Sequence, residues 1–473
     1  QLRYLLTIHS IFEFPHFFWT IKMQKHCQSV IIKSSQIIKT GECFRMINYN
    51  RLGYEIKRDL ANFSSKVSKG LKRPQEKFLL QMLYGILEGN KLHLSEIGRS
   101  LKENISLKKT IDRLSRNLNS FKGREAVMDN YIAFVKQNIK EDYAVIIVDG
   151  SDIAKPAAEK MEALSDIRDG STGEMARGYL TVEAAVLSKE GKMPLPVYER
   201  VFSAKEAGFI SETHENLCCL GFLSENFSRK CVRALDRGYD ANDYFRHFLK
   251  RGERFVIRVK KNRSVIHNGR TCNIMDVAGK YKGNYRMDFE DRHGKKVACK
   301  MSCIPVRLCG FPEKELVLVA VYGFGAEPML LLSNLRMQEK KQLCHIVAKV
   351  YLMRWRIEEY FRFKKQQFEL EDLRVMSLQS IRNMNLMAML AVGYIGITSV
   401  VKKNTIFLTE LKECSKRIYE IPKFIFYALG YAIERVLSKG YTGIGSYIPP
   451  KVKSQQMTLF EYFSLADSGG GTS

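Results

Sequence analysis

The spacing of apolar residues divides the chain into helical and strand-forming stretches. From 48 to about 140, apolar residues recur every three or four positions with few strong breakers, which is typical of packed helices. Residues 144–148 form a short continuous apolar run that stops at Asp149, as expected of a buried strand. The helical spacing returns from 338 to 401. The pattern therefore predicts a helical region, a sheet-containing region and a second helical region.

More strands are predicted after residue 149. The candidates are 180–187, 196–202, 231–235 and 254–259, and a predicted helix, 241–251, joins the last two. Strands that first follow one another and then alternate with a helix predict a mixed sheet with helices. Residues 264–335 again resemble short strands separated by polar turns, so this stretch is predicted to be a β-rich insertion.

Two short helices around a tight turn are predicted within the first helical region. Ser95 is placed to cap one of them and Ser106 to cap the other. The second helix carries four basic residues away from its apolar stripe: Lys108, Lys109, Arg113 and Arg116. This arrangement is typical of a helix that lies against DNA, and the alternative is a helical bundle with a solvated basic face.

The charge of the chain favours a polyanionic partner. Lys and Arg number 76 against 50 Asp and Glu, which gives a formal charge of +26 and a pI near 9.5. Because the excess is spread along the whole chain, nucleic acid is the leading partner, ahead of a membrane surface or a highly charged soluble protein without a polyanionic ligand. The 11 cysteines include no C-x-x-C pair, which favours reduced thiols over a zinc site.

The chain offers no convincing membrane span or signal peptide. Its most apolar stretch, 386–401, is interrupted by Gly393 and Gly396 and is short for a bilayer, so it is predicted to be a buried helix with no membrane partner. Residues 1–45 lack an initiating Met and a small-residue cleavage site. Because Met46 opens the helical pattern, 1–45 is expected to be upstream sequence read in frame.

Two carboxylates are predicted to meet at one edge of the sheet. Asp149 and Asp236 each end a predicted core strand, so each would emerge beside the other's strand. Carboxylate oxygens are ligands that Mg²⁺ prefers, and two ions about 4 Å apart can act together on one phosphate. The alternative for either residue alone is a turn-forming aspartate.

A third carboxylate lies on a polar stripe of a predicted helix. At about 100° per residue, four residues share an arc of about 60°: Tyr351, Arg354, Glu358 and Lys365. A carboxylate flanked by these groups suits a metal ligand among phosphate-binding side chains. The alternative is an Arg–Glu pair on a helix surface.

These spacings resemble a known family. Tyr351-x2-Arg354-x3-Glu358-x6-Lys365 resembles the signature of the insertion-sequence-four family of bacterial DDE transposases, in which Glu is the third catalytic acid. Asp149-Gly150-Ser151 resembles the first-acid motif with Ser in place of Thr, and 236–240 resembles the second. Asp152 competes for the first-acid position, and Asp149 is preferred because it follows the strand directly.

The resemblance covers about 143–401 and implies a fold. It implies an α/β mixed, ribonuclease H-like core with a β-rich insertion, preceded by an α-helical DNA-binding domain. The implied units are 46–140 as the DNA-binding domain, 141–263 with 336–401 as the catalytic core, 264–335 as the insertion, and 402–473 as a C-terminal helical region and flexible tail.

The resemblance also implies an activity. Asp149, Asp236 and Glu358 would be catalytic acids and ligands of Mg²⁺ or Mn²⁺, with two ions, while Tyr351, Arg354 and Lys365 would bind DNA near the cut. The implied enzyme binds the terminal inverted repeats of a bacterial insertion sequence as a homodimer, then cleaves double-stranded DNA and transfers its strands. It would act in the bacterial cytoplasm, at the nucleoid. The alternatives are a ribonuclease H-like nuclease without strand transfer and an inactive DNA-binding relative.

Two further features stay open. In better-known relatives a Trp in the insertion helps hold a flipped base, but the two tryptophans here are Trp19 and Trp355. Substitutes that could stack a base, or instead form a strand core, are Tyr281, Tyr285, Phe289 and Tyr322. In the tail, Gln456-Met457-Thr458-Leu459-Phe460 resembles the short motif by which bacterial proteins dock on the replication sliding clamp; the alternative is the apolar face of a last helix.

Overall fold

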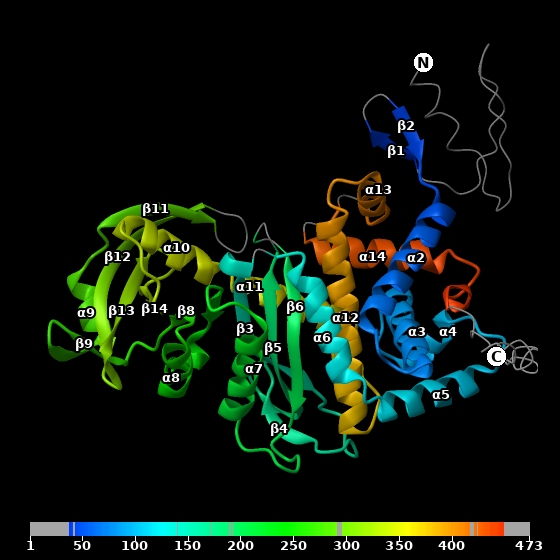
Figure 1. Cartoon of the computed structure of the whole chain (residues 1–473), viewed down its shortest axis with the longest axis horizontal. Helices are drawn as coiled ribbons and strands as arrows, with labels where there is room; N and C mark the ends of the chain where they lie inside the picture. Colours follow the sequence, from blue (N-terminus) through cyan, green and yellow to red (C-terminus); the bar gives the residue numbers. More distant parts are fainter. Residues whose placement is uncertain are drawn as a thin grey trace, which may run out of the picture.

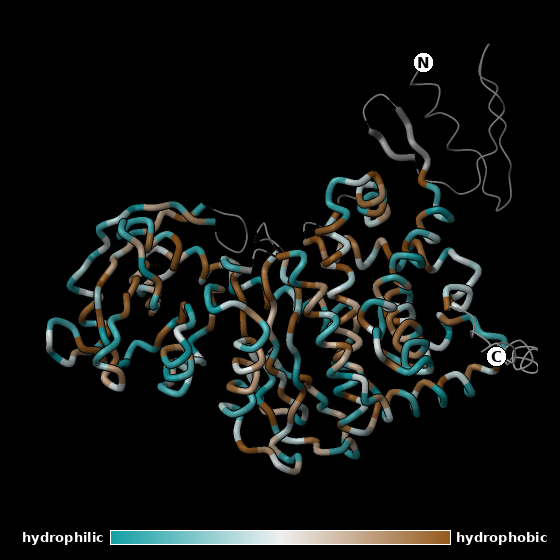
Figure 2. The backbone as a smooth tube through the Cα atoms, in the orientation of Figure 1, coloured by the Kyte–Doolittle hydropathy of each residue, from teal (hydrophilic) through white to brown (hydrophobic). Residues whose placement is uncertain are grey.

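The computed structural model describes residues 37–40, 43–139, 141–170, 172–188, 191, 193–290, 296–416, 421–422 and 424–448, with side chains from Ile47 onward except that of Glu141. Figure 1 shows a β-rich lobe at one end, a central sheet, and a helical body at the other end. Figure 2 shows hydrophobic segments concentrated along the central strands and the helices packed on them. The fold is therefore mixed α/β, as the sequence predicts.

Five strands form the core part of the sheet in the order β6-β5-β3-β7-β8. They are β3 (Val145–Ala154), β5 (Met175–Leu187), β6 (Pro194–Phe202), β7 (Val232–Leu235) and β8 (Arg254–Arg258). β5 runs antiparallel to β3 and β6, whereas β7 runs parallel to both β3 and β8. This arrangement is the ribonuclease H-like core that the resemblance implies. A short strand, β4 (Ser165–Arg168), pairs with β5.

Two helices connect and support these strands. α7 (Glu212–Asn226) precedes β7, and α8 (Asn242–Arg251) carries the chain from β7 to β8. α8 ends at Gly252, whose φ of +65° is a left-handed conformation that favours glycine. The predictions of four strands and one helix after residue 180 are confirmed: they correspond to β5, β6, β7, β8 and α8. Their boundaries agree within two residues, except that β5 begins five residues earlier than predicted.

The β-rich stretch extends the core sheet. Its elements are β9 (Ser264–His267), β10 (Arg270–Asn273), α9 (Ile274–Lys280), β11 (Tyr285–Glu290), β12 (Lys296–Leu308), β13 (Phe311–Tyr322) and β14 (Met329–Ser333). β14 pairs antiparallel with β8, so all of these strands and the core strands join one 12-stranded sheet. Backbone hydrogen bonds therefore couple the insertion directly to the strand next to β7.

The helical body combines the two ends of the described chain. Its helices are α2 (Tyr49–Val67), α3 (Arg73–Gly89), α4 (Leu94–Ser100), α5 (Leu107–Ser120), α6 (Arg124–Lys136), α12 (Leu378–Val401), α13 (Ile406–Cys414) and α14 (Ile425–Ser438). α14 packs on α2, α3 and α12, so the C-terminal helices share a core with the first helices. A hairpin, β1 (Ile37–Thr40) with β2 (Cys43–Met46), lies before α2.

α12 passes through this body beside β6. By length and composition it could cross a membrane, but 89% of its most apolar window is buried inside the protein. A helix that is hydrophobic on all sides belongs in a protein core or a bilayer, and here the β6 strand and the surrounding helices cover it. The prediction of a buried helix at 386–401 is confirmed.

The helix caps differ in part from the prediction. α4 begins one residue before Ser95 and has His93 at its N-cap position, so Ser95 lies inside the first turn. α5 begins directly after Ser106, as predicted, but the Ser106 side chain makes no capping hydrogen bond. The sequence therefore located both helices and misplaced one cap.

Candidate active site

The strand register brings Asp149 and Asp236 together. Val148 on β3 pairs with Leu235 on β7, and the two aspartates are the next residues on these parallel strands. The sequence predicts that this strand ends at Asp149. In the structure β3 continues to Ala154 by pairing with β5. β7 ends at Leu235, whereas β3 continues past Asp149. The side of β3 next to Asp149 is therefore no longer covered by β7 and is open to solvent and ligands.

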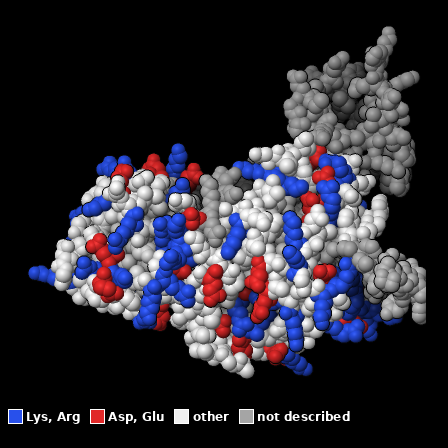
Figure 3. All heavy atoms as spheres, viewed as in Figure 1, with Lys and Arg blue, Asp and Glu red and all other residues white. Residues whose placement is uncertain are grey.

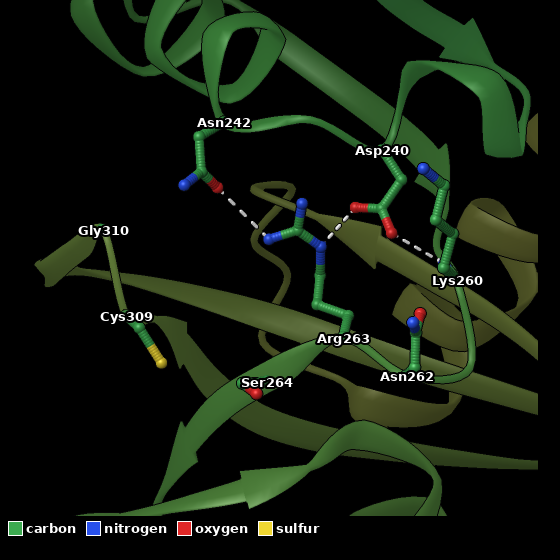
Figure 4. Close-up of a pocket in the computed structure, with 8 residues that line it drawn as sticks. All are labelled: Asp240, Asn242, Lys260, Asn262, Arg263, Ser264, Cys309 and Gly310. Carbon is green, nitrogen blue, oxygen red and sulfur yellow. Dashed lines mark hydrogen bonds and ion pairs between the residues drawn. The ribbon is translucent and has the colours of Figure 1, made fainter.

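A tight turn fixes the backbone after Asp236. The Gly238 N–H donates to the Asp236 Oδ1 at 2.6 Å, which caps a single helical turn over Arg237–Tyr239. The second acid of this motif, Asp240, is buried; it pairs with Arg263 and accepts a hydrogen bond from the Lys260 backbone N–H at 2.7 Å (Figure 4). Asp240 therefore anchors the turn to the segment before β9, and Asp236 is the acid available to a ligand.

The polar stripe is divided between two helices. α10 (Lys340–Leu352) contains Tyr351, whereas α11 (Trp355–Gln367) contains Glu358 and Lys365. At Arg354 the backbone hydrogen bonds tighten to three-residue spacing: its N–H donates to the Tyr351 carbonyl at 2.9 Å, and its carbonyl accepts from the Ile357 N–H at 3.1 Å. The prediction of one continuous helix is wrong, because this turn interrupts the four-residue ladder.

Arg354 joins two of the three predicted acids. Its guanidinium donates through one nitrogen to the Asp149 Oδ2 and through the other to the Glu358 Oε1. It also lies over the Tyr351 ring, 5.9 Å from the ring centroid. The tertiary structure thus gathers Tyr351, Arg354 and Glu358 around Asp149, even though they lie more than 200 residues away along the chain.

The acids outnumber the cation that they share. Burial raises the pKa of Asp149 to about 7; the Arg354 guanidinium opposes this shift, and the charges of Asp236 and Glu358 add to it. Burial lowers the pKa of Arg354, but the surrounding carboxylates, Asp149 above all, raise it further than burial lowers it. Three carboxylates against one guanidinium leave excess negative charge on hard oxygen ligands, and this donor set fits a divalent cation.

A hollow of about 440 Å³ opens beside the two aspartates. Its wall includes Asn216 and Tyr244, and Tyr239 donates to the Asn216 Oδ1 at 3.2 Å while the Asn216 amide donates to the Tyr244 hydroxyl at 3.2 Å. The sequence analysis did not identify this polar wall, because α7 has no motif that distinguishes Asn216 from a surface residue. The hollow is a space in which a phosphodiester could reach Asp149 and Asp236.

Lys365 pairs with two other carboxylates. Its ammonium is 3.0 Å from the Asp152 Oδ2 and 2.9 Å from the Glu371 Oε1. Burial lowers the pKa of Lys365, but these two carboxylates raise it, so the ammonium stays charged. Because Asp152 is buried against Lys365, whereas Asp149 faces Asp236, the geometry favours Asp149 as the first acid.

The predicted DNA-binding helix has a basic surface. Lys108, Lys109 and Arg116 on α5 are exposed, and Figure 3 shows basic side chains over this helix at the lower right. Arg113 instead donates to Glu103 at 2.5 Å and to the Gln81 side chain at 2.8 Å. The structure therefore places three of the four predicted residues toward solvent and the fourth against α3 and the turn before α5.

One aromatic candidate for base stacking is buried, and the other three are half-buried. Phe289 is buried and stacks on His345 with ring centroids 5.5 Å apart. The Tyr322 hydroxyl donates to the Ala278 carbonyl at 2.8 Å, and the Tyr281 hydroxyl lies 3.0 Å from His267 Nε2. Phe289, Tyr281 and Tyr322 are thus held by contacts with neighbouring residues, whereas Tyr281, Tyr322 and Tyr285 are all half-buried.

Comparisons with known proteins bear on this site. Residues 220–393 match the family model described as "Transposase DDE domain". Among solved structures, the chain is similar to a piggyBac transposase in a synaptic complex with hairpin DNA, at 12% identity over 89% of each chain with a TM-score of 0.38. It is also similar to the Drosophila P element transposase in a strand transfer complex, at 9% identity over 80% of this chain and 87% of that one, with a TM-score of 0.16. Curated proteins give no match.

The family match covers part of the site described above. It includes Asp236, the insertion and Glu358, and it begins after Asp149. The first acid is tied to this segment by the register of β3 on β7 and by its ion pair with Arg354. Residues 220–393 thus carry a DDE transposase domain signature, and this match supports a transposase of the DDE type.

Proposed function

We propose that this chain is the DNA transposase of a bacterial insertion sequence, similar to the insertion-sequence-four family, and that it cleaves element ends and transfers the freed strands to target DNA. One observation carries the proposal. The register of β3 on β7 sets Asp149 beside Asp236, and Arg354 links Asp149 to Glu358. Three acids from separate parts of the chain meet there, next to an open hollow.

Asp149, Asp236 and Glu358 are the residues that would hold Mg²⁺ or Mn²⁺, as two ions. Such ions supply Lewis-acid stabilisation of the charge that develops on a reacting phosphate. The chain's own contribution is to orient the DNA. Arg354 carries a planar guanidinium whose donors suit phosphate oxygens; without metal two of its nitrogens bind Asp149 and Glu358, and a metal bound by these acids would release them for phosphate. The Tyr351 ring lies 5.9 Å from this guanidinium. The polar wall around Asn216 bounds the phosphodiester on the other side.

Other partners follow from the same proposal. Exposed basic residues of α5 would contact the backbone of the terminal inverted repeats, and two copies of the chain would pair the two ends as a homodimer in the bacterial cytoplasm. The segment Gln456–Phe460, proposed to dock on the replication sliding clamp, lies outside the described residues. A peptide spanning 453–465 should bind the clamp with a Kd of about 1 µM or tighter, near −8 kcal/mol; no measurable binding would contradict the docking proposal.

The experiment uses a plasmid that carries the element with its flanking DNA and a second plasmid as target. Purified full-length protein with Mg²⁺ or Mn²⁺ should cut at the element ends and insert them into the target, and chelation should stop both steps. Cutting without insertion would indicate a ribonuclease H-like nuclease that does not join strands. Asp236→Asn should abolish cutting with end binding retained. Asp240→Asn is not a suitable control because Asp240 anchors the turn, so Glu225→Gln, at an exposed position of α7, serves instead.

A further inference from the structure

The sheet register aligns a row of carboxylates across three strands. Asp149 on β3 pairs directly with Glu183 on β5, and Glu183 pairs directly with Glu199 on β6. Directly opposite residues of antiparallel strands point to the same face of the sheet, with Cβ atoms about 5 Å apart. Glu183 and Glu199 are buried, 1% and 2% exposed. Neither was identified from the sequence.

Like charges opposite one another destabilise a sheet, and a buried carboxylate without a partner is strongly unfavourable. Each member of the row is paired with its own cation. Arg354 pairs with Asp149, Lys364 on α11 pairs with Glu183, and Arg124 on α6 pairs with Glu199. Each carboxylate of the row therefore has a cation beside it, which offsets the cost of burying its charge.

Lys364 is the most completely bonded of these cations. It is 1% exposed, and its ammonium lies 2.7 and 2.9 Å from the two oxygens of Glu183 and 2.7 Å from the Asn385 Oδ1 on α12. All three ammonium donors are thus used. One turn earlier on α11, the Tyr360 hydroxyl donates to the same Glu183 at 2.5 Å. Two side chains of α11 therefore donate hydrogen bonds to one carboxylate of β5.

The hydrogen bonds from Lys364 and Tyr360 to Glu183 also bear on the position of Glu358, which lies on the same helix. Within the described residues, the polar contact of the Glu358 side chain is with Arg354 alone, and the side chain is 42% exposed. Its place is therefore determined mainly by the helix that carries it. Glu358 precedes Lys364 by six residues, or about 9 Å along the helix axis. Because Glu183 is also the cross-strand neighbour of Asp149, one residue serves as the reference point for both acids.

We propose that Lys364 is a positioning residue: through its buried pair with Glu183 it fixes α11 on the sheet, so that Glu358 meets Asp149 and Asp236 in the geometry that binds metal. The proposal rests on the transposase function above for the meaning of the acids. The observations that carry it are the register of Asp149 on Glu183 and the four hydrogen bonds that join Glu183, Lys364, Tyr360 and Asn385.

The decisive variant replaces both members of the pair, Lys364→Met with Glu183→Met. Because it removes one positive and one negative charge, the net charge of the row is unchanged, and apolar side chains of similar length keep the fold stable. The single variant Lys364→Met leaves Glu183 buried without its cation and should melt at a clearly lower temperature. The double variant should melt well above the single variant, and below wild type only by the cost of leaving the Tyr360 hydroxyl and the Asn385 Oδ1 without these partners.

Metal affinity is then measured without DNA, from the electron paramagnetic resonance signal of free Mn²⁺. Replacing residues that orient metal ligands lowers affinity or activity about 10- to 100-fold, and the double variant should lose Mn²⁺ affinity and single-turnover cleavage by about tenfold or more. End-DNA binding should stay within about twofold of wild type, because the exposed basic residues that set it are unchanged. If metal affinity and cleavage recover together with the melting temperature, the pair is structural only and the proposal is wrong.

A mutant cycle that combines the double variant with Glu358→Gln tests whether the loss of Mn²⁺ affinity arises through Glu358. Coupled residues give non-additive effects, so the double replacement should weaken Mn²⁺ binding much less in the Glu358→Gln background. An equal loss in both backgrounds would overturn the proposal.

Arg51→Met serves as the matched control, since it removes the cation beside the buried Glu410 in the helical body and should lower the melting temperature without changing Mn²⁺ affinity. A loss of Mn²⁺ affinity in Arg51→Met similar to that of the double variant would also overturn the proposal, because general destabilisation would then explain it. If the wild type binds Mn²⁺ but cuts no DNA, the transposase function fails, while the Mn²⁺ readout still decides the role of Lys364.

Discussion

Replacing Asp149 by asparagine should stabilise the metal-free protein at pH 8 while abolishing cleavage. Burial raises the pKa of Asp149 from 3.8 to about 7, with Asp236 and Glu358 adding to the shift and Arg354 opposing it. The ionised side chain is therefore disfavoured in the folded protein relative to the unfolded chain. Asparagine has a similar shape and carries no charge in either state, so the variant is free of this penalty.

The size and sign follow from linkage between protonation and folding. A shift of about three units, at about 1.4 kcal/mol per unit, corresponds to about 4 kcal/mol. Between pH 4 and 7 the folded protein binds a proton that the unfolded chain has released, so wild-type stability falls as the pH rises through this window. The advantage of Asp149→Asn should be near zero at pH 4 and complete above pH 7.

The assay is urea unfolding of wild type and variant in the presence of a chelator, at pH 4.5 and at pH 8. Mn²⁺ should reverse the order at pH 8, because it binds the wild-type carboxylates and stabilises only the state that holds them. The control is Asp152→Asn, which loses the 3.0 Å ion pair with Lys365 and should be less stable than wild type at pH 8. If Asp149→Asn is no more stable than wild type at pH 8, or if its advantage is the same at both pH values, the electrostatic account of the site is refuted.

Three further outcomes are expected. Glu358→Ala should lose cleavage with end binding largely intact, measured by gel analysis and by fluorescence anisotropy; retained cleavage would remove Glu358 from the acids. Lys365→Ala should weaken end binding and lower the slope of log K against log salt by about one, and an unchanged slope would mean that Lys365 serves only Asp152 and Glu371. Alanine at the exposed basic positions of α5 should weaken end binding with little change in melting temperature. Arg113→Ala should instead lower the melting temperature, because it releases Glu103 and Gln81. The reverse pattern would contradict the placement of this helix. The exposed positions are Lys108, Lys109 and Arg116.

The sequence by itself determined the local elements and the candidate residues within them. Strand runs such as 144–148 and the helix at 241–251 follow from periodicity, since the pattern of apolar residues is a property of neighbours in the chain. The spacing from Arg354 to Glu358 likewise places two side chains one turn apart, and the structure pairs them. These features depend on a few consecutive residues, which is why one sequence was enough to predict them.

Only the tertiary structure decided which of these residues meet. The register of β3 on β7 aligns Asp149 with Asp236, and that of β3 on β5 aligns Asp149 with Glu183. The turn at Arg354 also depends on packing, because the sequence there has no Gly or Pro to interrupt a helix. The buried pair of Glu183 and Lys364 joins residues 181 positions apart, and no local pattern encodes such a contact. Its partners are chosen by the need to match every buried charge, a condition that applies only once the sheet and helices have come together.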